Sequence, residues 1–105
     1  MGIGAKRDIR EAIRLYHLAA EQGDGLSQFN LARRYQEGKD VSPDRVEAYF
    51  WFALAAVNGV EGASEMRDGL KKEMTRQQVA EAKRKIAGFK SAPRRQPGTS
   101  GPRVK

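Results

Sequence analysis

The chain repeats itself at an interval of 36 residues, and this repeat constrains the fold more than any other feature. The segment from Asp8 to Gly23 matches the segment from Asp44 to Gly59 at seven of sixteen positions. A repeat of this length is one supersecondary unit, and stacked copies bury the apolar face that a single unit leaves exposed. We therefore expect a short array of similar units.

Each copy of the repeated segment has the pattern of one amphipathic helix. Asp8 and Asp44 precede the pattern, and each is expected to cap the first turn together with the glutamate three positions later, Glu11 or Glu47. The apolar residues that follow are spaced by three and four, which places them on one helix face. Each helix is expected to run for about fifteen residues and to end at a glycine.

The rest of the chain predicts three further helices. Asp24 is placed to cap a helix that runs to about Glu37 and stops at Gly38. Thr75 and Gln78 have the spacing of a capping box that opens the last helix. The inward residues of the last two helices are expected to be Ala63, Met66, Leu70, Met74, Val79, Ala82, Ile86 and Phe89.

These patterns predict an all-α fold, an α-solenoid of antiparallel helix pairs with about two and a half repeats and five helices. Residues 2–8 align with the loop 38–44, so we expect them to form a loop and the first helix of the first pair to be missing. The expected units are a partial repeat 1–23, a full repeat 24–59, a divergent cap 60–89 and a disordered basic tail 90–105.

Composition limits the classes of protein. The chain has no cysteine, which excludes a disulfide scaffold and the common zinc frameworks. Its longest apolar run, residues 48–57, is too short to span a bilayer, and no signal peptide is visible. These observations favour a cytoplasmic location.

The net charge of +7 is concentrated at one end. Residues 90–105 hold five Lys and Arg and no acid, so they contribute +5 and residues 1–89 only +2. This balance does not favour nucleic acid as a partner of the folded part. The tail alone is an alternative site for nucleic acid or an anionic membrane, but it has no aromatic residue to stack on bases, and we prefer a solvated tail.

The spacing of the matched residues resembles the Sel-1-like repeat, a relative of the tetratricopeptide repeat. The resemblance rests on Ser27-x-x-x-Leu31-Ala32-x-x-Tyr35-x-x-Gly38 and on Ala48-x-x-Trp51-Phe52-x-x-Ala55-Ala56-x-x-Gly59. The segment Met74-Thr-x-x-Gln78 is similar to the closing segment of bacterial members. Ala32 replaces the family's usual glycine, and the third pair lacks the motif. The resemblance implies an adaptor that binds other proteins.

No catalytic, cofactor or metal site is expected. His17 is the only histidine and its repeat counterpart is Ala53, so we expect a surface or groove-edge residue and not a base or a ligand. The repeated carboxylates are explained as helix caps. The aromatic run from Tyr49 to Phe52 is expected to belong to the core.

By analogy with tetratricopeptide grooves, the partner is a protein or peptide bound by the outer face of the second helix. The expected residues are Leu26, Phe29, Arg33, Gln36 and Glu37. Phe29 either anchors a partner or covers the seam between two helices. An alternative function is self-association as a homodimer through the uncovered flank of the first helix, near Ile9, Ile13 and Tyr16.

Overall fold

The computed structural model describes residues 2–89, with side chains from Ile9 to Phe89. Within this range the chain is all α-helical, as the repeat predicted. The helices are α1 (Gly2–Glu21), α2 (Gly25–Glu37), α3 (Arg45–Val57), α4 (Ala63–Lys71) and α5 (Arg76–Gly88). The expected disordered tail, and the charge that it carries, lie outside the described residues.

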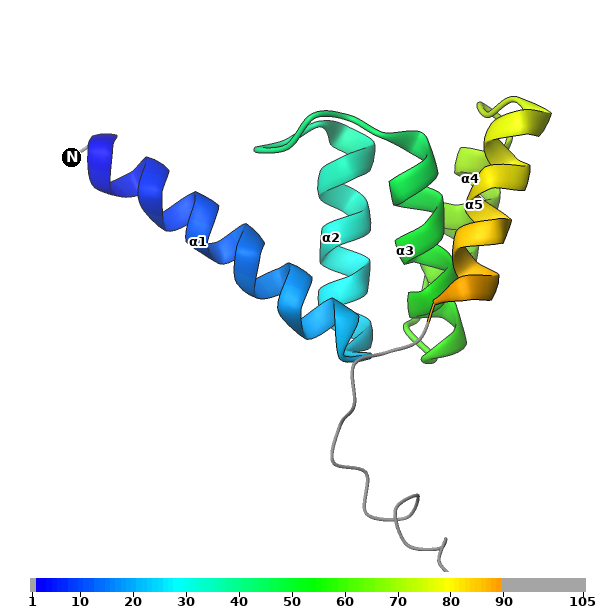
Figure 1. Cartoon of the computed structure of the whole chain (residues 1–105), viewed down its shortest axis with the longest axis horizontal. Coiled ribbons are helices and arrows are strands. Elements are labelled where there is room, and N and C mark those ends of the chain that lie inside the picture. Colours follow the sequence, from blue (N-terminus) through cyan, green and yellow to red (C-terminus); the bar gives the residue numbers. More distant parts are fainter. Residues whose placement is uncertain (1, 90–105) are drawn as a thin grey trace, which may run out of the picture.

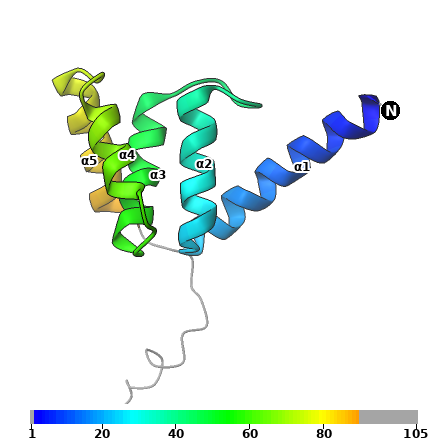
Figure 2. The same ribbon diagram turned by 180° about the vertical axis from the view of Figure 1, so that it is seen from behind.

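The helices follow one another in space in the order in which they occur in the sequence (Figures 1 and 2). The most extensive contact joins α2 and α3, and both α4 and α5 pack against α3. The C-terminal end of α1 lies against the base of α2, and the rest of α1 diverges from the other helices (Figure 1). The molecule is thus a short row of helix pairs with one outlying helix.

Three predicted N-caps are confirmed. The side chains of Asp24, Asp44 and Thr75 each accept a hydrogen bond from the backbone N–H three residues later. Thr75 and Gln78 exchange both bonds of a capping box. Gly38 ends α2 in the left-handed conformation at φ 71°, which is also as predicted.

The expected capping role of Glu47 is wrong. Its carboxylate accepts a hydrogen bond from the indole Nε1 of Trp51 at 3.1 Å and lies 2.7 Å from the ammonium group of Lys85. The backbone N–H of Asp44, which a capping box would pair with Glu47, donates instead to the carbonyl of Tyr35. Glu47 therefore connects α3 to α5.

The expected start of the first helix at Asp8 is also wrong, because α1 is helical from Gly2. The loop that aligns with residues 2–8 contains Pro43, which disfavours a helical residue before it and removes a backbone donor. No proline occurs in residues 2–8, so the helix continues upstream. Glu11 accordingly lies inside the helix and pairs with Arg14 at 2.5 Å.

The core is centred on α3. Every residue from Ala48 to Ala55 is buried, and Phe52 is fully enclosed. Removing a phenylalanine side chain from water stabilises the fold by about 1.5–3 kcal/mol. Neighbouring helices cover α3 with Leu31 and Ala32 of α2, Leu70 of α4 and Ala82 of α5. The expectation that this aromatic helix is the most deeply buried is confirmed.

One buried polar side chain joins three helix ends. Gln28 is only 1% exposed, and its Nε2 donates to the carbonyl of Ala20 at 3.0 Å. Its Oε1 accepts from Nδ2 of Asn58 at 2.9 Å. Since a buried amide is tolerated only when its hydrogen bonds are made, Gln28 fixes the ends of α1, α2 and α3 relative to one another.

Candidate protein-binding surface

The outer face of α2 presents a stripe of exposed side chains. Leu26, Asn30, Arg33 and Glu37 are separated by four, three and four residues and therefore share one side of the helix. All four are exposed, and Leu26 is 67% exposed. We call these four residues the α2 stripe.

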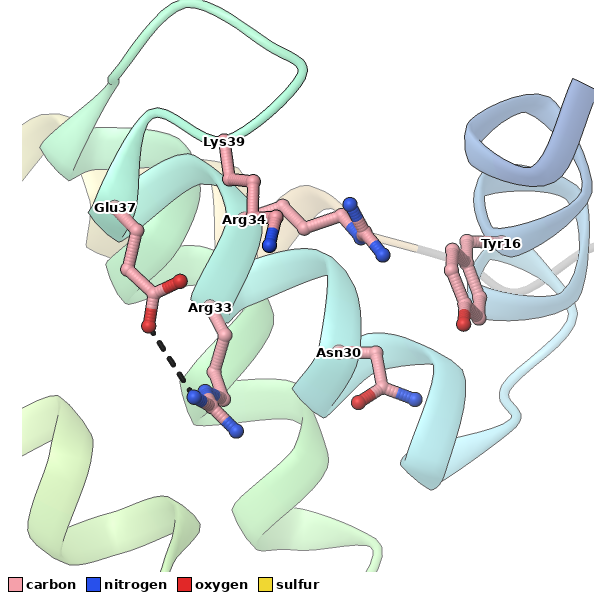
Figure 3. Close-up of a pocket in the computed structure, with 6 residues that line it drawn as sticks. All are labelled: Tyr16, Asn30, Arg33, Arg34, Glu37 and Lys39. Carbon is pink, nitrogen blue, oxygen red and sulfur yellow. Dashed lines mark hydrogen bonds and ion pairs between the residues drawn. The ribbon is translucent and has the colours of Figure 1, made fainter. Parts of the chain in front are cut away.

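A cavity of about 190 Å³ lies beside the α2 stripe, between α2 and α1. Figure 3 shows Tyr16 of α1 on one side of it and the side chains of α2 on the other. The lining residues are Tyr16, Asn30, Arg33, Arg34, Glu37 and Lys39. We call this space the α1/α2 cavity.

The charges around the α1/α2 cavity are partly compensated. Arg33 pairs with Glu37 at 3.2 Å, and Arg34 pairs with Asp40 at 2.6 Å. The Arg34 guanidinium also lies 5.6 Å from the ring centroid of Tyr16, which attracts a cation. The side chain of Lys39 has no carboxylate partner among the described residues, so three cations face two carboxylates and an excess of one positive charge remains.

The structure places three of the five predicted partner-binding residues on the α2 stripe, namely Leu26, Arg33 and Glu37. Phe29 is half-buried and packs edge-on against Phe52 at a centroid distance of 5.6 Å, so it covers the seam between α2 and α3. The partner-binding role of all these residues stays a prediction.

The fifth predicted residue, Gln36, lies on a different surface. It lines a cavity of about 310 Å³ formed by the ends of α2 and α4 and the starts of α3 and α5. Sequence reasoning missed Asn30, which replaces Phe29 on the α2 stripe. Asn30 lies four residues after Leu26 and three before Arg33, and this spacing could have placed it on the same helix face as those two residues.

A third cavity, of about 260 Å³, lies among α1, α3 and α5 and includes His17. The Nε2 of His17 is 3.0 Å from the hydroxyl of Tyr35, and its ring meets Trp51 edge-on at 6.2 Å. His17 is therefore at the edge of a groove, as expected. Burial first, and then the nearby carboxylates Glu47 and Asp44, raise the pKa of Tyr35, so its phenol stays protonated at neutral pH.

The residues expected to support self-association are not equally accessible. Ile9 is 39% exposed, but Ile13 and Tyr16 are half-buried, and Tyr16 packs against the core. Among the described residues, no three His, Cys, Asp or Glu side chains gather as metal ligands would. None of the helices in the described range is long and apolar enough to cross a membrane.

Comparisons with known proteins agree with this architecture. The chain is 36% identical over 75 residues to chitin synthase regulatory factor 3 of Schizosaccharomyces pombe, covering 57% of this chain and 8% of that protein. It is 40% identical over 55 residues to the exopolysaccharide production negative regulator of Rhizobium leguminosarum bv. viciae, covering 52% of this chain and 21% of the relative. The chain therefore spans only a small part of the length of these relatives.

The family model that describes the Sel1 repeat matches residues 1–24 and 25–60, more than half of the chain. The second match contains the whole of α2 and α3. With the sequential packing of the helix pairs, this match identifies the chain as a member of the Sel1 repeat family.

Proposed function

We propose that this chain holds a partner protein or peptide against the α2 stripe and the α1/α2 cavity. Sel1 repeats are helical repeats that generally mediate protein–protein interactions, and they are typically non-catalytic. The observation that carries the proposal is an exposed leucine on the same helix face as Arg33, beside a cavity whose lining and ion pairs leave one positive charge in excess. Apolar contact and charge on one surface are what a specific peptide site requires.

The chemistry of this surface favours an acidic partner segment. Leu26 offers an apolar contact, and Lys39 with the two nearby arginines attracts a carboxylate. The Arg33–Glu37 pair is exposed and contributes little to stability, so it opens at low cost for an incoming acid. Leu26 and Arg33 are about 10 Å apart along the helix, so we expect the bound segment to carry an apolar side chain and, a few residues away, an acidic one. We expect its affinity to fall as salt is added.

The relatives support a binding role. Both carry names of regulators, one of chitin synthase and one of exopolysaccharide production. A regulator acts by contacting another component. We therefore place the function of this chain in recognition and not in a reaction of its own.

A matched pair of variants tests the proposal. Leu26→Asp with Arg33→Glu reverses both properties of the α2 stripe. Val57→Asp with Arg84→Glu makes the same two kinds of change, and the same change in net charge, at exposed side chains of α3 and α5. Affinity capture from the source cell, followed by titration of the purified partner, is expected to lose the partner with the first variant and to keep it with the second. Circular dichroism checks that both remain helical.

Equal retention by the two variants would remove the α2 stripe from consideration. Loss of the partner by both would show that exposed apolar side chains in general are involved, which also contradicts a site on α2.

A further inference from the structure

The cavity of about 260 Å³ among α1, α3 and α5 has an aromatic lining. Phe50 and Trp51 of α3 and Phe89 after the end of α5 meet edge-on in it, with ring centroids 4.7 to 6.0 Å apart. Because Phe50 and Trp51 are almost completely buried, packing fixes the positions of their rings. We call this space the α3/α5 groove.

One cation already lies in the α3/α5 groove. The ammonium group of Lys85 is 2.7 Å from Oε2 of Glu47 and 5.0 Å from the centroid of the Phe50 ring. A carboxylate and an aromatic face are the two kinds of partner that bind a cation most strongly. The contacts of Lys85 therefore mark the position where a cation fits.

The carboxylate of Glu47 is held in place, and Lys85 is not. Oε1 of Glu47 accepts a hydrogen bond from the indole Nε1 of Trp51 at 3.1 Å, which leaves Oε2 directed to the cation. The side chain of Glu47 is 24% exposed, whereas that of Lys85 is 39% exposed and has a long flexible stem. An ion pair with so exposed a partner opens at low cost, so Lys85 can leave the groove while Glu47 stays.

Lys85 does not balance the charges of the groove. Glu21 of α1 lines it as well, so two carboxylates face one ammonium group, and one negative charge is in excess when His17 is neutral. The α1/α2 cavity has an excess of the opposite sign, and the two spaces have no lining residue in common. The α3/α5 groove is therefore complementary to a cationic ligand.

We propose that the α3/α5 groove binds an arginine side chain from a segment of a partner protein, and that this arginine displaces Lys85 from Glu47 and Phe50. A guanidinium group is planar, so it stacks on an aromatic ring while it donates several hydrogen bonds to carboxylates. The ammonium group of Lys85 is a compact point charge and is more strongly hydrated. Arginine is thus the stronger ligand for this site, and Lys85 is the internal occupant that it replaces.

Trp51 makes binding at this site directly observable. It is the only tryptophan, so the chain has a single indole N–H signal in a heteronuclear NMR spectrum, and that group donates to Glu47. The probes are three capped tripeptides, acetyl-Ala-Arg-Ala-amide and its equivalents with Lys or Gln in the centre, titrated into the full chain. The arginine peptide is expected to shift the signal with a Kd of roughly 1 mM, the lysine peptide to bind more weakly and the glutamine peptide to have no effect.

Removing the internal occupant is expected to strengthen binding. In Lys85→Gln the affinity for the arginine peptide should rise about three- to fivefold, because the peptide no longer competes with an ammonium group. Lys83→Gln removes the same charge from an exposed position of the same helix outside the groove. This control should change the affinity by less than about twofold.

Removing the negative charge is expected to have the opposite effect. Glu47→Gln keeps an acceptor for the indole of Trp51 and loses the charge, so the affinity for the arginine peptide should fall about fivefold or more. Glu81→Gln, at an exposed position of α5 outside the groove, is the matched control. Circular dichroism checks that all four variants remain helical.

Three results would overturn the proposal. The first is equal binding of the arginine and glutamine peptides, and the second is an affinity in Lys85→Gln that does not exceed that of Lys83→Gln. The third concerns the arginines of the chain itself at positions 94 and 95. If Arg94→Gln with Arg95→Gln raised the affinity for the arginine peptide as much as Lys85→Gln does, the groove would belong to these residues and not to a partner.

This inference does not rest on the proposed function. Glu47 and Lys85 belong neither to the α2 stripe nor to the α1/α2 cavity, so their variants are expected to retain partner capture there. Leu26→Asp with Arg33→Glu is in turn expected to retain binding of the arginine peptide. Failure of one proposal is therefore recognised separately from failure of the other.

Discussion

At the scale of single residues, the most consequential side chain is one that is polar and buried. Gln28 makes hydrogen bonds to a carbonyl of α1 and to the amide of Asn58, and it has almost no contact with solvent. Its position, three residues before Leu31 and four before Ala32, marked it as inward-facing. The sequence analysis nevertheless did not predict the hydrogen bonds of Gln28, because periodicity gives the direction of a side chain and not its hydrogen-bond partner.

Replacing Gln28 by leucine is expected to destabilise the fold by about 1–3 kcal/mol, since the carbonyl of Ala20 and the amide of Asn58 each lose one of their hydrogen bonds inside the protein. Urea unfolding followed by the fluorescence of Trp51, the only tryptophan, measures this change. Gln77→Leu, at an exposed position of α5, is the control and should change the unfolding free energy by less than about 0.5 kcal/mol. Equal effects of the two changes would contradict the assignment.

The phenol of Tyr35 gives a prediction about alkaline pH. Burial and the nearby carboxylates raise its pKa in the folded state, so the protonated phenol stabilises the fold fully below the unfolded pKa of about 10. That contribution is lost as the pH rises through the folded pKa. We expect the unfolding free energy to fall less steeply above pH 10 in Tyr35→Phe than in the unchanged chain. The unfolding free energy is measured by urea titration at several pH values. The same dependence on pH in both proteins would contradict a raised pKa of Tyr35.

At the scale of elements, the sequence was informative wherever a helix boundary has a chemical cause. The starts of α2, α3 and α5 follow from the side chains of Asp24, Asp44 and Thr75. The start of α1 did not follow from Asp8, because a capping residue acts only where the backbone before it leaves the helix. No proline forces that departure in residues 2–8.

The candidate site could be predicted only in part for a related reason. Helical spacing placed Leu26, Arg33 and Glu37 on an exposed stripe, but whether Phe29 points to solvent depends on the neighbouring helix. Phe52 fills the space beside Phe29 and draws it into the seam. The sequence pattern of α2 alone, or of α3 alone, does not indicate which side chains of the two helices will touch.

Two glycines in different elements predict opposite effects of the same substitution. Gly38→Ala is expected to destabilise by about 1 kcal/mol or more, because φ is 71° there and a Cβ atom would lie 2.9 Å from Cγ of Pro43. Gly69→Ala, inside α4 with open space around it, is expected to stabilise by about 0.5–1 kcal/mol. Urea unfolding of both variants measures the two signs. The same sign for both would contradict this account.

At the scale of the whole molecule, stability is distributed unevenly along the row of helices. The helix α3 is covered by three others, and α1 is supported mainly at one end (Figure 1). In repeat proteins each unit depends on its nearest neighbours, so the outermost element opens first.

Native-state hydrogen exchange is expected to follow this order. Backbone amides of α3 should exchange most slowly, with a protection that approaches the free energy of global unfolding, and amides in the first half of α1 should exchange fastest. Uniform protection across the helices would contradict the description.

The way in which α1 is attached has a mechanical consequence. Gln28 holds the C-terminal end of that helix through the carbonyl of Ala20, and the N-terminal end lies away from the other helices. A rotation of α1 would therefore be centred near Ala20. A rotation about that point would widen or narrow the space in front of Arg34, and it would also move His17 relative to Trp51 of α3. The angle between α1 and α2 therefore sets the thickness of ligand that the α1/α2 cavity admits, and the contacts of His17 limit how far that angle can change.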